Sequence, residues 1–388
     1  MKQSERASLP KWLDEVSFQS ARENLLLWYD RFKRDLPWRE LQDPWATWVS
    51  EVMLQQTRVS SVLSYFDRFM TRFPTPLSLA EAEWDEVASF WAGLGYYRRV
   101  KNLQRGAQEV VERHRGCVPD DLDAVRALTG VGAYTAGAIL SIAFDREVPI
   151  VDGNVMRVFA RLFRIDQDIQ LSATQKLFWA IADHWVHGPR PGDFNQALME
   201  LGATVCTPKK PTCLVCPLRA QCRAVIEADP LQYPVSLKKK KALPIDERLA
   251  LALTSGGAGE ERKYWLSRRE GEGLLEGMWS IPQVSSPSSL EALSQEQICR
   301  LLKEVSLSEH LVEVPDLPFI EHRFTHKIWR LKLVTLHLEE FTPDPSARLK
   351  GWSVEELDQL AVGGPSLKAL RSLGVPLKAR RGAGRAKK

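Results

Sequence analysis

The sequence predicts a mainly α-helical N-terminal half followed by an α+β C-terminal domain. Across residues 18–225, apolar residues recur three and four positions apart, and Gly and Pro stand at segment ends, as in a chain of helices. After Cys222 the pattern changes to short alternating segments that are typical of strands. Four of the six cysteines fall between Cys206 and Cys222, which places a possible metal centre at the end of the helical half.

The composition fits a multidomain globular protein. With 388 residues, of which 44% are hydrophobic, the chain can form two or three cores. The longest apolar run, residues 136–144, is about half the length of a bilayer span, and the first residues do not resemble a secretory signal. We therefore expect no membrane association and a reducing, cytoplasmic location. The net charge of +4 does not by itself identify a nucleic-acid binder.

The domain boundaries are expected where the pattern changes. The predicted parts are a helical region over 1–236 that contains the cysteine loop 206–222, a linker over 237–245, a second domain over 246–376 and a basic tail over 377–388. The second domain mixes both kinds of element. Its strands are expected over 248–254, 263–269 and 329–338, and its helices near 290–304 and over 353–372.

The helical pattern is clearest from residue 46 to 63. Its apolar stripe consists of Trp48, Val49, Val52, Met53, Val59 and Val62. This stripe leaves Glu51, Gln55 and Arg58 along the adjacent face. We therefore expect Glu51 to face a groove.

The spacing C-x6-C-x2-C-x5-C indicates metal ligation rather than a disulfide framework. The four ligands would be Cys206, Cys213, Cys216 and Cys222. Zinc is the commoner occupant of an arbitrary four-cysteine set, but one knuckle flanked by two longer loops suits an iron–sulfur cubane better. His184 and His187 have no further ligand nearby in the sequence and are interpreted as ordinary helix residues.

A Gly-x-Gly turn at residues 128–132 precedes a predicted helix that begins near Tyr134. Gly130 and Gly132 permit positive φ and close backbone approach, and the free N–H groups of the helix could bind a phosphate. The same turn could simply join two helices. Asp152, about twenty residues further on, could likewise be an ordinary N-cap.

Together these motifs resemble the helix-hairpin-helix DNA glycosylases that carry a [4Fe–4S] cluster, and among them the MutY family of adenine glycosylases. The matching strings are 36–39, 51–57, 93–97, 128–132, 151–155, 194–197 and the four cysteines. The resemblance implies a six-helix domain of this type, a [4Fe–4S] cofactor on the cysteines, and base excision repair of double-stranded DNA. The substrate would be adenine paired with 8-oxoguanine or guanine, and the enzyme a monomer of the bacterial type, in the cytoplasm and associated with the nucleoid.

The resemblance also assigns the chemistry. Bifunctional relatives carry a lysine nucleophile where this sequence has Tyr134, so a monofunctional hydrolysis of the N-glycosidic bond is implied. Glu51 would protonate adenine at N7, with its pKa raised by apolar neighbours. Asp152 would stabilise the oxocarbenium-like sugar, while Asn154 and Tyr134 orient Asp152 and the water.

The base has to be flipped out of the duplex before it can react. By resemblance, Gln55, Gln56 and Tyr96 would face the DNA and fill the gap, and Trp38, Arg39 and Gln196 would line the adenine pocket. The remaining residues assigned to the DNA-binding surface are Leu54, Thr57, Gly130 and Gly132.

The C-terminal domain resembles the Nudix-like domain of the same family through the strings 274–282 and 322–326. The resemblance implies that this domain recognises 8-oxoguanine through the loop Phe324, Thr325 and His326. The family commonly has serine at the middle position, so Thr325 bears on the details of discrimination. A glutamate-rich pyrophosphatase box is absent from the sequence, which disfavours a metal-dependent nucleotide hydrolase.

Two other functions stay open on the sequence. A mismatch glycosylase for thymine or uracil could use the same scaffold, although Gln196 and the Nudix-like domain disfavour it. A non-catalytic DNA-binding module is disfavoured because both Glu51 and Asp152 are retained.

Overall fold

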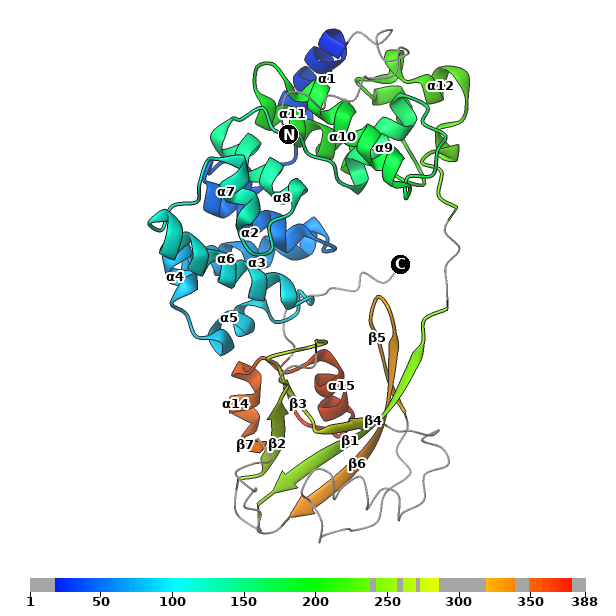
Figure 1. Cartoon of the computed structure of the whole chain (residues 1–388). Helices are drawn as coiled ribbons and strands as arrows, with labels where there is room; N and C mark the ends of the chain where they lie inside the picture. The colour runs from blue at the N-terminus through cyan, green and yellow to red at the C-terminus, as the bar shows by residue number, and fades with distance from the viewer. Residues whose placement is uncertain are drawn as a thin grey trace. The chain divides into compact units, whose positions relative to one another are not determined.

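The computed structural model of the chain is drawn in Figure 1. The structure describes residues 18–237, 242–256, 261–269, 273–285, 319–338 and 349–378. The predicted helix at 290–304, the lysine run at 238–241 and most of the basic tail lie outside these residues. Contacts divide the chain into two compact units, Met1–Ala82 with Arg99–Lys239, and Glu83–Arg98 with Lys240–Lys388. Within the described part, none of the helices combines the length and apolarity that a membrane span requires.

The first unit is helical, as the sequence predicts. Its α-helices are α1 (Phe18–Phe32), α2 (Pro44–Leu54), α3 (Val59–Arg72), α4 (Pro76–Ala80), α6 (Arg98–His114), α7 (Leu122–Ala127), α8 (Ala133–Ala138), α9 (Gly153–Leu162), α10 (Ser172–Val186), α11 (Pro191–Thr204) and α12 (Arg223–Glu227). A π-helical turn, Ile139–Ala143, follows α8 directly. Aromatic side chains of α9, α10 and α11 pack together around Trp185, which places these three helices in one core.

The helical pattern expected over 46–63 is observed as two helices, α2 and α3. The side chain of Asp43 caps α2 by accepting the Trp45 N–H at 3.0 Å, and the helix ends at Leu54. The chain then turns through Gln56, whose φ is +56°, before α3 begins at Val59. The apolar residues of both helices are still buried, among them Trp48 and Val52 of α2 and Val62 of α3. Glu51 is buried, with 6% of its surface exposed, rather than on an open face.

The second unit contains the α+β domain, which the sequence also predicts. Its strands are β1 (Ile245–Ser255), β2 (Lys263–Arg268), β3 (Trp279–Ser280), β4 (Gln283–Ser285), β5 (Ile320–Arg323), β6 (Ile328–Leu338) and β7 (Leu349–Trp352). They form one mixed sheet in the order β3-β2-β1-β6-β5, with β4 beside β1 and β7 beside β2. β1 and β6 run parallel over their whole length, while the other pairs are antiparallel.

Helices α14 (Val354–Gln359) and α15 (Gly364–Ser372) replace the single helical stretch expected over 353–372. The first helix ends at Gln359, and the sequence Gly363-Gly364-Pro365 begins the second, with Gly363 as its N-cap and the proline in its first turn. Helix α5 (Trp84–Trp91) lies in the N-terminal half of the sequence, yet it belongs to this second compact unit.

Candidate active site

The buried carboxyl group of Glu51 lies at the centre of the site. It is carried by the last turn but one of α2, and its Oε2 accepts a hydrogen bond from the Tyr134 hydroxyl at 2.6 Å. Burial raises the pKa of Glu51 to about 7, and the negative charge of Asp152 adds to this increase. The hydrogen bond from Tyr134 and the charge of Arg39 act in the opposite direction. Glu51 can therefore keep its proton near neutral pH.

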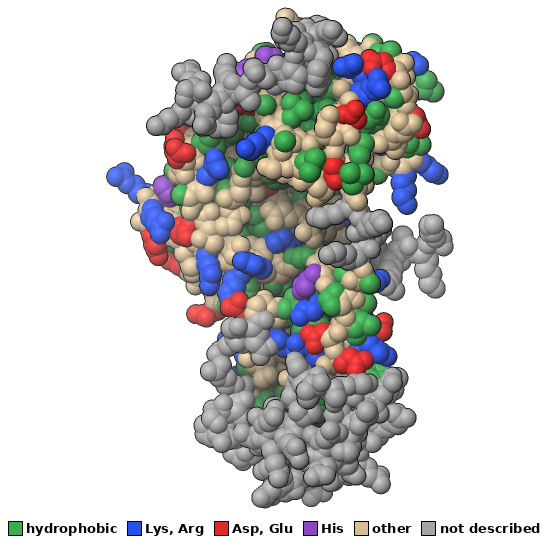
Figure 2. Space-filling view, turned by 45° about the vertical axis from the view of Figure 1, so that its right-hand side comes forward, with side chains coloured by type: hydrophobic (Ala, Val, Ile, Leu, Met, Phe, Trp, Pro, Cys, Tyr) green, Lys and Arg blue, Asp and Glu red, His purple; other side chains and the backbone are tan. Residues whose placement is uncertain are grey.

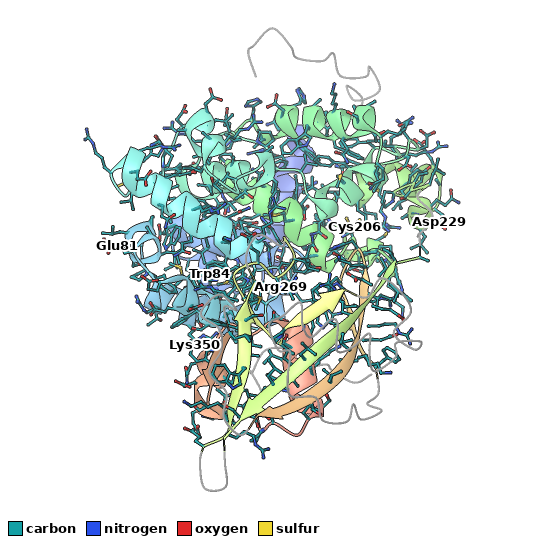
Figure 3. All side chains as sticks on the ribbon, turned by 60° about the horizontal axis from the view of Figure 1, so that its bottom comes forward. Glu81, Trp84, Cys206, Asp229, Arg269 and Lys350 are labelled. Atoms are coloured by element: carbon teal, nitrogen blue, oxygen red, sulfur yellow. The ribbon has the colours of Figure 1, made fainter. Side chains whose placement is uncertain are left out.

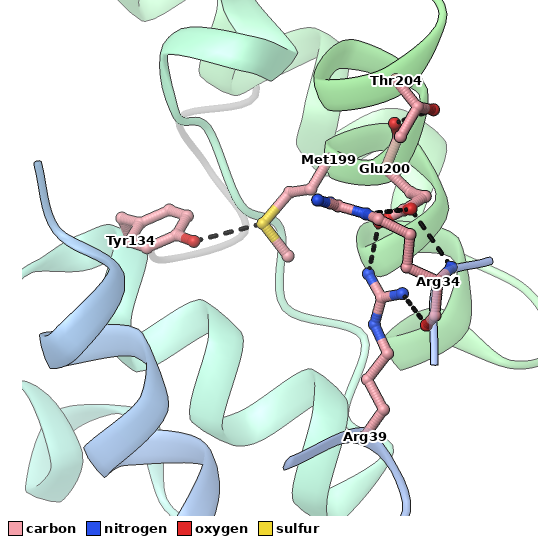
Figure 4. A network of polar contacts seen from close by, with 6 residues as sticks. All are labelled: Arg34, Arg39, Tyr134, Met199, Glu200 and Thr204. Atoms are coloured by element: carbon pink, nitrogen blue, oxygen red, sulfur yellow. Dashed lines mark hydrogen bonds and ion pairs between the residues drawn. The ribbon is translucent and has the colours of Figure 1, made fainter. Parts of the chain in front are cut away.

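Tyr134 joins the helical hairpin to two other elements of the site. It lies in the first turn of α8, and its hydroxyl oxygen is 3.1 Å from the sulfur of Met199 on α11 (Figure 4). A hydroxyl has one proton, and the carboxylate oxygen is the stronger acceptor, so Tyr134 donates to Glu51. Burial, with the nearby charges of Glu51 and Asp152, raises the pKa of Tyr134 well above its usual value, which keeps the hydroxyl a donor.

Asp152 is the N-cap of α9, as one interpretation of the sequence predicts. This role in the helix is compatible with a role in catalysis. Its Oδ1 accepts the Val155 N–H at 2.8 Å, and its Oδ2 accepts from the Asn154 side chain at 2.9 Å. Burial raises the pKa of Asp152, whereas these N–H groups and the charge of Arg157 lower it. Donors thus stabilise the charge on Asp152, while Glu51 receives one hydroxyl. Of the two acidic groups, Glu51 is therefore the one that keeps its proton near neutral pH.

Arg157 holds Asn154 in place and is a residue that sequence reasoning missed. Its Nη2 donates to the Asn154 Oδ1 at 2.9 Å and to the Gly202 carbonyl at 2.7 Å, and its Nε donates to the Cys206 carbonyl at 2.8 Å. Helix α11 can come this close because a Cβ on Gly202 would lie 2.7 Å from the Asn154 Cβ. A continuous set of hydrogen bonds therefore runs from Asp152 to the first of the four clustered cysteines.

The four cysteines lie in one short region beside α9 and α12. As they stand, no three His, Cys, Asp or Glu side chains in the described ranges are placed to hold a metal ion. The chemistry of the donors nevertheless fits a cationic centre. Burial, and then the neighbouring thiols of Cys206, Cys222 and Cys213, raise the pKa of Cys216 to about 12, so the thiols are close enough to repel one another when ionised. The Arg161 guanidinium donates to the Cys206 sulfur at 3.3 Å.

The residues predicted to line an adenine pocket are all at least partly buried. Trp38 packs edge-to-face on Phe66 with ring centroids 5.3 Å apart, and Gln196 lies on α11 with 9% of its surface exposed. Arg39 forms an ion pair at 2.7 Å with the fully buried side chain of Glu200, which Arg34 also contacts (Figure 4). Of these three predicted residues, Arg39 has an electrostatic effect on Glu51.

The turn between α2 and α3 carries four predicted DNA contacts. Leu54, Gln55 and Thr57 are partly buried and Gln56 is exposed. Arg99 fixes this turn, because its Nη1 donates to the carbonyls of Val52 at 2.8 Å, Met53 at 3.0 Å and Gln55. A guanidinium at the C-terminal end of α2 also complements the helix dipole. The sequence did not single out Arg99.

The hairpin turn before α8 uses its two glycines differently. Gly130 has φ +83°, and a Cβ there would lie 2.7 Å from the Asn102 Cβ. Gly132 is extended, with φ −94°, and caps α8 with no heavy atom within 4 Å of an added Cβ. Gly130 therefore uses the positive φ that glycine permits, whereas Gly132 does not. Gly132 leaves open space at the helix N-terminus.

The remaining predicted contacts belong to the second unit. Phe324, Thr325 and His326 form the turn between β5 and β6, which the Phe324 N–H closes by donating to the Lys327 carbonyl at 2.8 Å. The Phe324 ring packs against Trp329 and His322, whereas Thr325 and His326 are exposed. Tyr96, which follows α5, is 44% exposed.

His184 and His187, which the sequence analysis did not interpret as metal ligands, are exposed residues of the surface. His184 packs its ring edge-on against Phe18, and His187 contacts the Glu147 carboxylate at 2.8 Å. Basic side chains are similarly unremarkable in distribution, since those on the face of the helical unit in Figure 2 are interspersed with acidic ones. Overall charge thus adds little to the assignment of the site.

The sequence is similar to known families in both of its domains. Residues 49–184 match the HhH-GPD superfamily of base excision DNA repair proteins, and residues 257–372 match the NUDIX domain. The adenine DNA glycosylase of Rattus norvegicus is 38% identical over 92% of this chain and 78% of its own length. That of Homo sapiens is 35% identical over 88% of this chain and 72% of its own length.

Among solved structures, a thermostable thymine-DNA glycosylase aligns with a TM-score of 0.50 and 28% identity, over 54% of this chain and 97% of its own. That likeness covers the helical fold, whereas the two curated relatives extend across both domains. Because relatives at 38% and 35% identity extend over both domains, the chain belongs to the adenine DNA glycosylase family.

Proposed function

We propose that this protein removes adenine from DNA where adenine is paired with 8-oxoguanine or guanine, and leaves an abasic site. The observation that carries the proposal is the buried pair Glu51 and Asp152, in which burial raises the pKa of Glu51 to about 7, whereas N–H donors and Arg157 oppose the increase at Asp152. Hydrolysis of an N-glycosidic bond requires this difference, because the base must be protonated as it leaves while positive charge develops on the sugar.

In the proposed reaction, Glu51 donates its proton to N7 of the extruded adenine, which becomes a good leaving group. The Tyr134 hydroxyl fixes the Glu51 carboxyl group in position. Asp152, held by Asn154 and the Val155 N–H, stabilises the oxocarbenium-like sugar. A water molecule then adds to C1′ of the sugar and loses a proton to solvent, which completes the hydrolysis and leaves the abasic site. Because a phenol stands where an amine nucleophile would be needed, no Schiff base forms at Tyr134, and the strand is left intact.

A [4Fe–4S] cluster is the cofactor that we propose for the four cysteines. When bound, the cluster would supply the positive charge that lets four neighbouring thiolates stay ionised. Arg157 and Arg161 contact the Cys206 carbonyl and sulfur, so this loop is tied to α9. A yellow-brown protein with about four iron atoms per chain would support this cofactor. A colourless protein with one zinc would contradict it.

The pH dependence of excision should follow the Glu51 proton. Its pKa of about 7 predicts that the single-turnover rate falls about tenfold per pH unit above neutrality, because the donor is lost. The folded protein also binds this proton more tightly than the unfolded chain, so the free energy of unfolding should decrease between pH 4.5 and about 7. The excision rate and the thermal unfolding, each measured as a function of pH, test these two expectations. A rate that stays constant to pH 9 would contradict the assignment of Glu51 as the proton donor.

Substitutions of the two hairpin glycines should have different effects: one should change DNA affinity and the other the stability of the fold. Gly132→Ala places a methyl group in open space, so we expect unchanged unfolding but about fivefold weaker duplex binding, because the DNA backbone would approach there. Gly130→Ala requires a strained φ and collides with Asn102, so it should destabilise the fold by about 2 kcal/mol. Thermal unfolding and fluorescence anisotropy with a labelled duplex measure the two effects. Unchanged affinity in Gly132→Ala would contradict a phosphate contact there.

The experiment that tests the function uses four duplexes that differ at one pair: A:8-oxoguanine, A:G, T:G and U:G. The products are treated with alkali, which breaks the strand at abasic sites. We expect alkali-dependent cleavage of the first two duplexes at the adenine. Release of thymine or uracil instead would favour the alternative of a different mismatch specificity, and a protein that binds these duplexes but cleaves none would favour a DNA-binding module. Cleavage without alkali would indicate lyase chemistry.

A further inference from the structure

Helix α5 is held by the C-terminal domain through three kinds of contact. The Trp84 Nε1–H donates to the Gly277 carbonyl at 3.0 Å. Ala88, Met278 and Ala361 form a small core with no exposed surface, against which Trp84, Tyr97 and Leu275 pack. Asp85 lies 3.4 Å from Arg268, but both side chains are more than a third exposed, so this ion pair adds little. The hydrogen bond and the apolar core therefore hold the helix.

The receiving turn is shaped for Trp84. Gly277 has φ +80°, and a Cβ at this position would lie 2.9 Å from the Trp84 Nε1. Two backbone hydrogen bonds close the turn, from the Gly277 N–H to the Arg269 carbonyl at 2.7 Å and from the Arg269 N–H to the Met278 carbonyl at 3.0 Å. Figure 3 shows Trp84 and Arg269 together at this place. No other residue than glycine meets both requirements without a shift.

The same contacts determine where Tyr96 lies. Residues 93–97 form a tight loop after α5, in which Gly93, Gly95 and Tyr96 all have positive φ. The loop is closed by the Trp91 Nε1–H, which donates to the Gly95 carbonyl at 3.0 Å. Tyr97 packs on the Met278 core, whereas its neighbour Tyr96 is exposed. Because this loop has little conformational freedom, the position of Tyr96 depends on the contacts that hold Tyr97 and α5 on the Met278 core.

The turn that receives α5 continues directly into the sheet. Met278 precedes β3, which pairs with β2, and the sheet extends through β1 and β6 to β5. The exposed loop of Thr325 and His326 joins β5 to β6. Tyr96 and this loop are therefore carried by a single compact unit, although more than 200 residues separate them in the sequence.

We propose that the contact between Trp84 and Gly277 is a positioning device, which fixes Tyr96 to the C-terminal sheet so that Tyr96 and the Phe324–Thr325–His326 loop read the base opposite adenine together. The inference rests on the proposed function and deepens it: discrimination between 8-oxoguanine and guanine depends on α5 as well as on the C-terminal loop. Trp84 and Gly277 are positioning residues in this scheme, since they act through Tyr96.

The test compares three single variants of the full chain. Gly277→Ala introduces both a strained φ and a collision with Trp84, whereas Trp84→Phe keeps an aromatic ring but removes the N–H donor together with the five-membered part of the indole. Gly374→Ala is the matched control, because Gly374 has φ +78° in the same unit but no heavy atom within 4 Å of an added Cβ. Single-turnover rates of adenine release are measured on A:8-oxoguanine and A:G duplexes, with thermal unfolding of each variant.

We expect the ratio of the two rates to fall about fivefold in Gly277→Ala and in Trp84→Phe, the effect of about one lost hydrogen bond. The ratio should stay at the wild-type value in Gly374→Ala. If instead both rates fall together with the unfolding temperature, the contact is merely structural and the inference is overturned. Unchanged ratios in Trp84→Phe overturn it as well, even where Gly277→Ala does not fold. Wild-type protein that releases adenine from neither duplex would remove the proposed function first, and the inference with it.

Discussion

Glu51→Gln is expected to bind a duplex with an A:8-oxoguanine pair but to release adenine at least about a thousandfold more slowly, the range of a lost general acid. Glutamine has the shape of a protonated glutamic acid and can still accept the hydrogen bond from Tyr134. It cannot transfer a proton to N7. Single-turnover kinetics and anisotropy of a labelled duplex separate the lost chemistry from the retained binding.

Two comparisons make this result specific. Glu112→Gln, at an exposed position of α6, is the control for the same chemical change and should behave as the wild type. A duplex with 7-deazaadenine lacks the atom that accepts the proton, so the wild-type protein should bind it without releasing the base. Near-normal turnover by Glu51→Gln, or rapid release of 7-deazaadenine, would show that Glu51 is not the proton donor.

Asp152→Asn is the second change with a large expected effect, a loss of about a thousandfold in the rate of adenine release. Asparagine is as good an N-cap as aspartate and can still accept the Val155 N–H, so α9 should keep its cap, although the new amide no longer accepts from the Asn154 side chain. The negative charge beside the developing sugar cation is lost. Thermal unfolding is expected to be close to that of the wild type, which separates the electrostatic role from the structural one.

The same substitution should also move the pH profile. The charge of Asp152 raises the pKa of Glu51, so its removal lowers that pKa. The residual activity of Asp152→Asn should therefore begin to fall at a lower pH than wild-type activity does. A rate near the wild-type value would mean that the charge of Asp152 does not stabilise the developing sugar cation. A pH profile that does not move would mean that this charge does not raise the pKa of Glu51.

Sequence alone was sufficient for the longer elements of the fold. Strands expected over 248–254, 263–269 and 329–338 are observed as β1, β2 and β6 with ends that differ by three residues or fewer. The strands β3, β4, β5 and β7 were not predicted, because two to four residues are too few to show an alternating pattern. The parallel pairing of β1 with β6 joins segments far apart in the chain, and no local signal encodes it.

The residues of the site could be predicted from the sequence only where they belong to short motifs. The residues Glu51, Tyr134, Asp152 and Asn154 were predicted from their strings, and the structure brings them into hydrogen-bonding or electrostatic contact. Their roles in catalysis stay predictions. The motifs contain nothing about burial, however, which raises the pKa of both carboxyl groups, or about the N–H donors that oppose this increase at Asp152.

The supporting residues were missed because each acts across a long stretch of sequence. Arg157 reaches the Gly202 carbonyl of α11, Met199 contacts Tyr134 of α8, and Trp84 donates to a turn 193 residues away. Such contacts arise only when the elements are packed. One sequence signal was available for Arg157, since it lies three residues after Asn154 on the same face of α9.

The titration of the Glu51 carboxyl group in the free protein is the most direct test of the central claim. Carbon-13 labelling of the glutamate carboxyl groups, with Glu51→Gln as the reference that identifies the signal, gives this pKa by NMR. A signal that titrates near pH 7 and is absent from Glu51→Gln is the predicted result. A Glu51 signal that titrates near 4.5, the usual value for glutamate, would contradict a stored proton and the mechanism built on it.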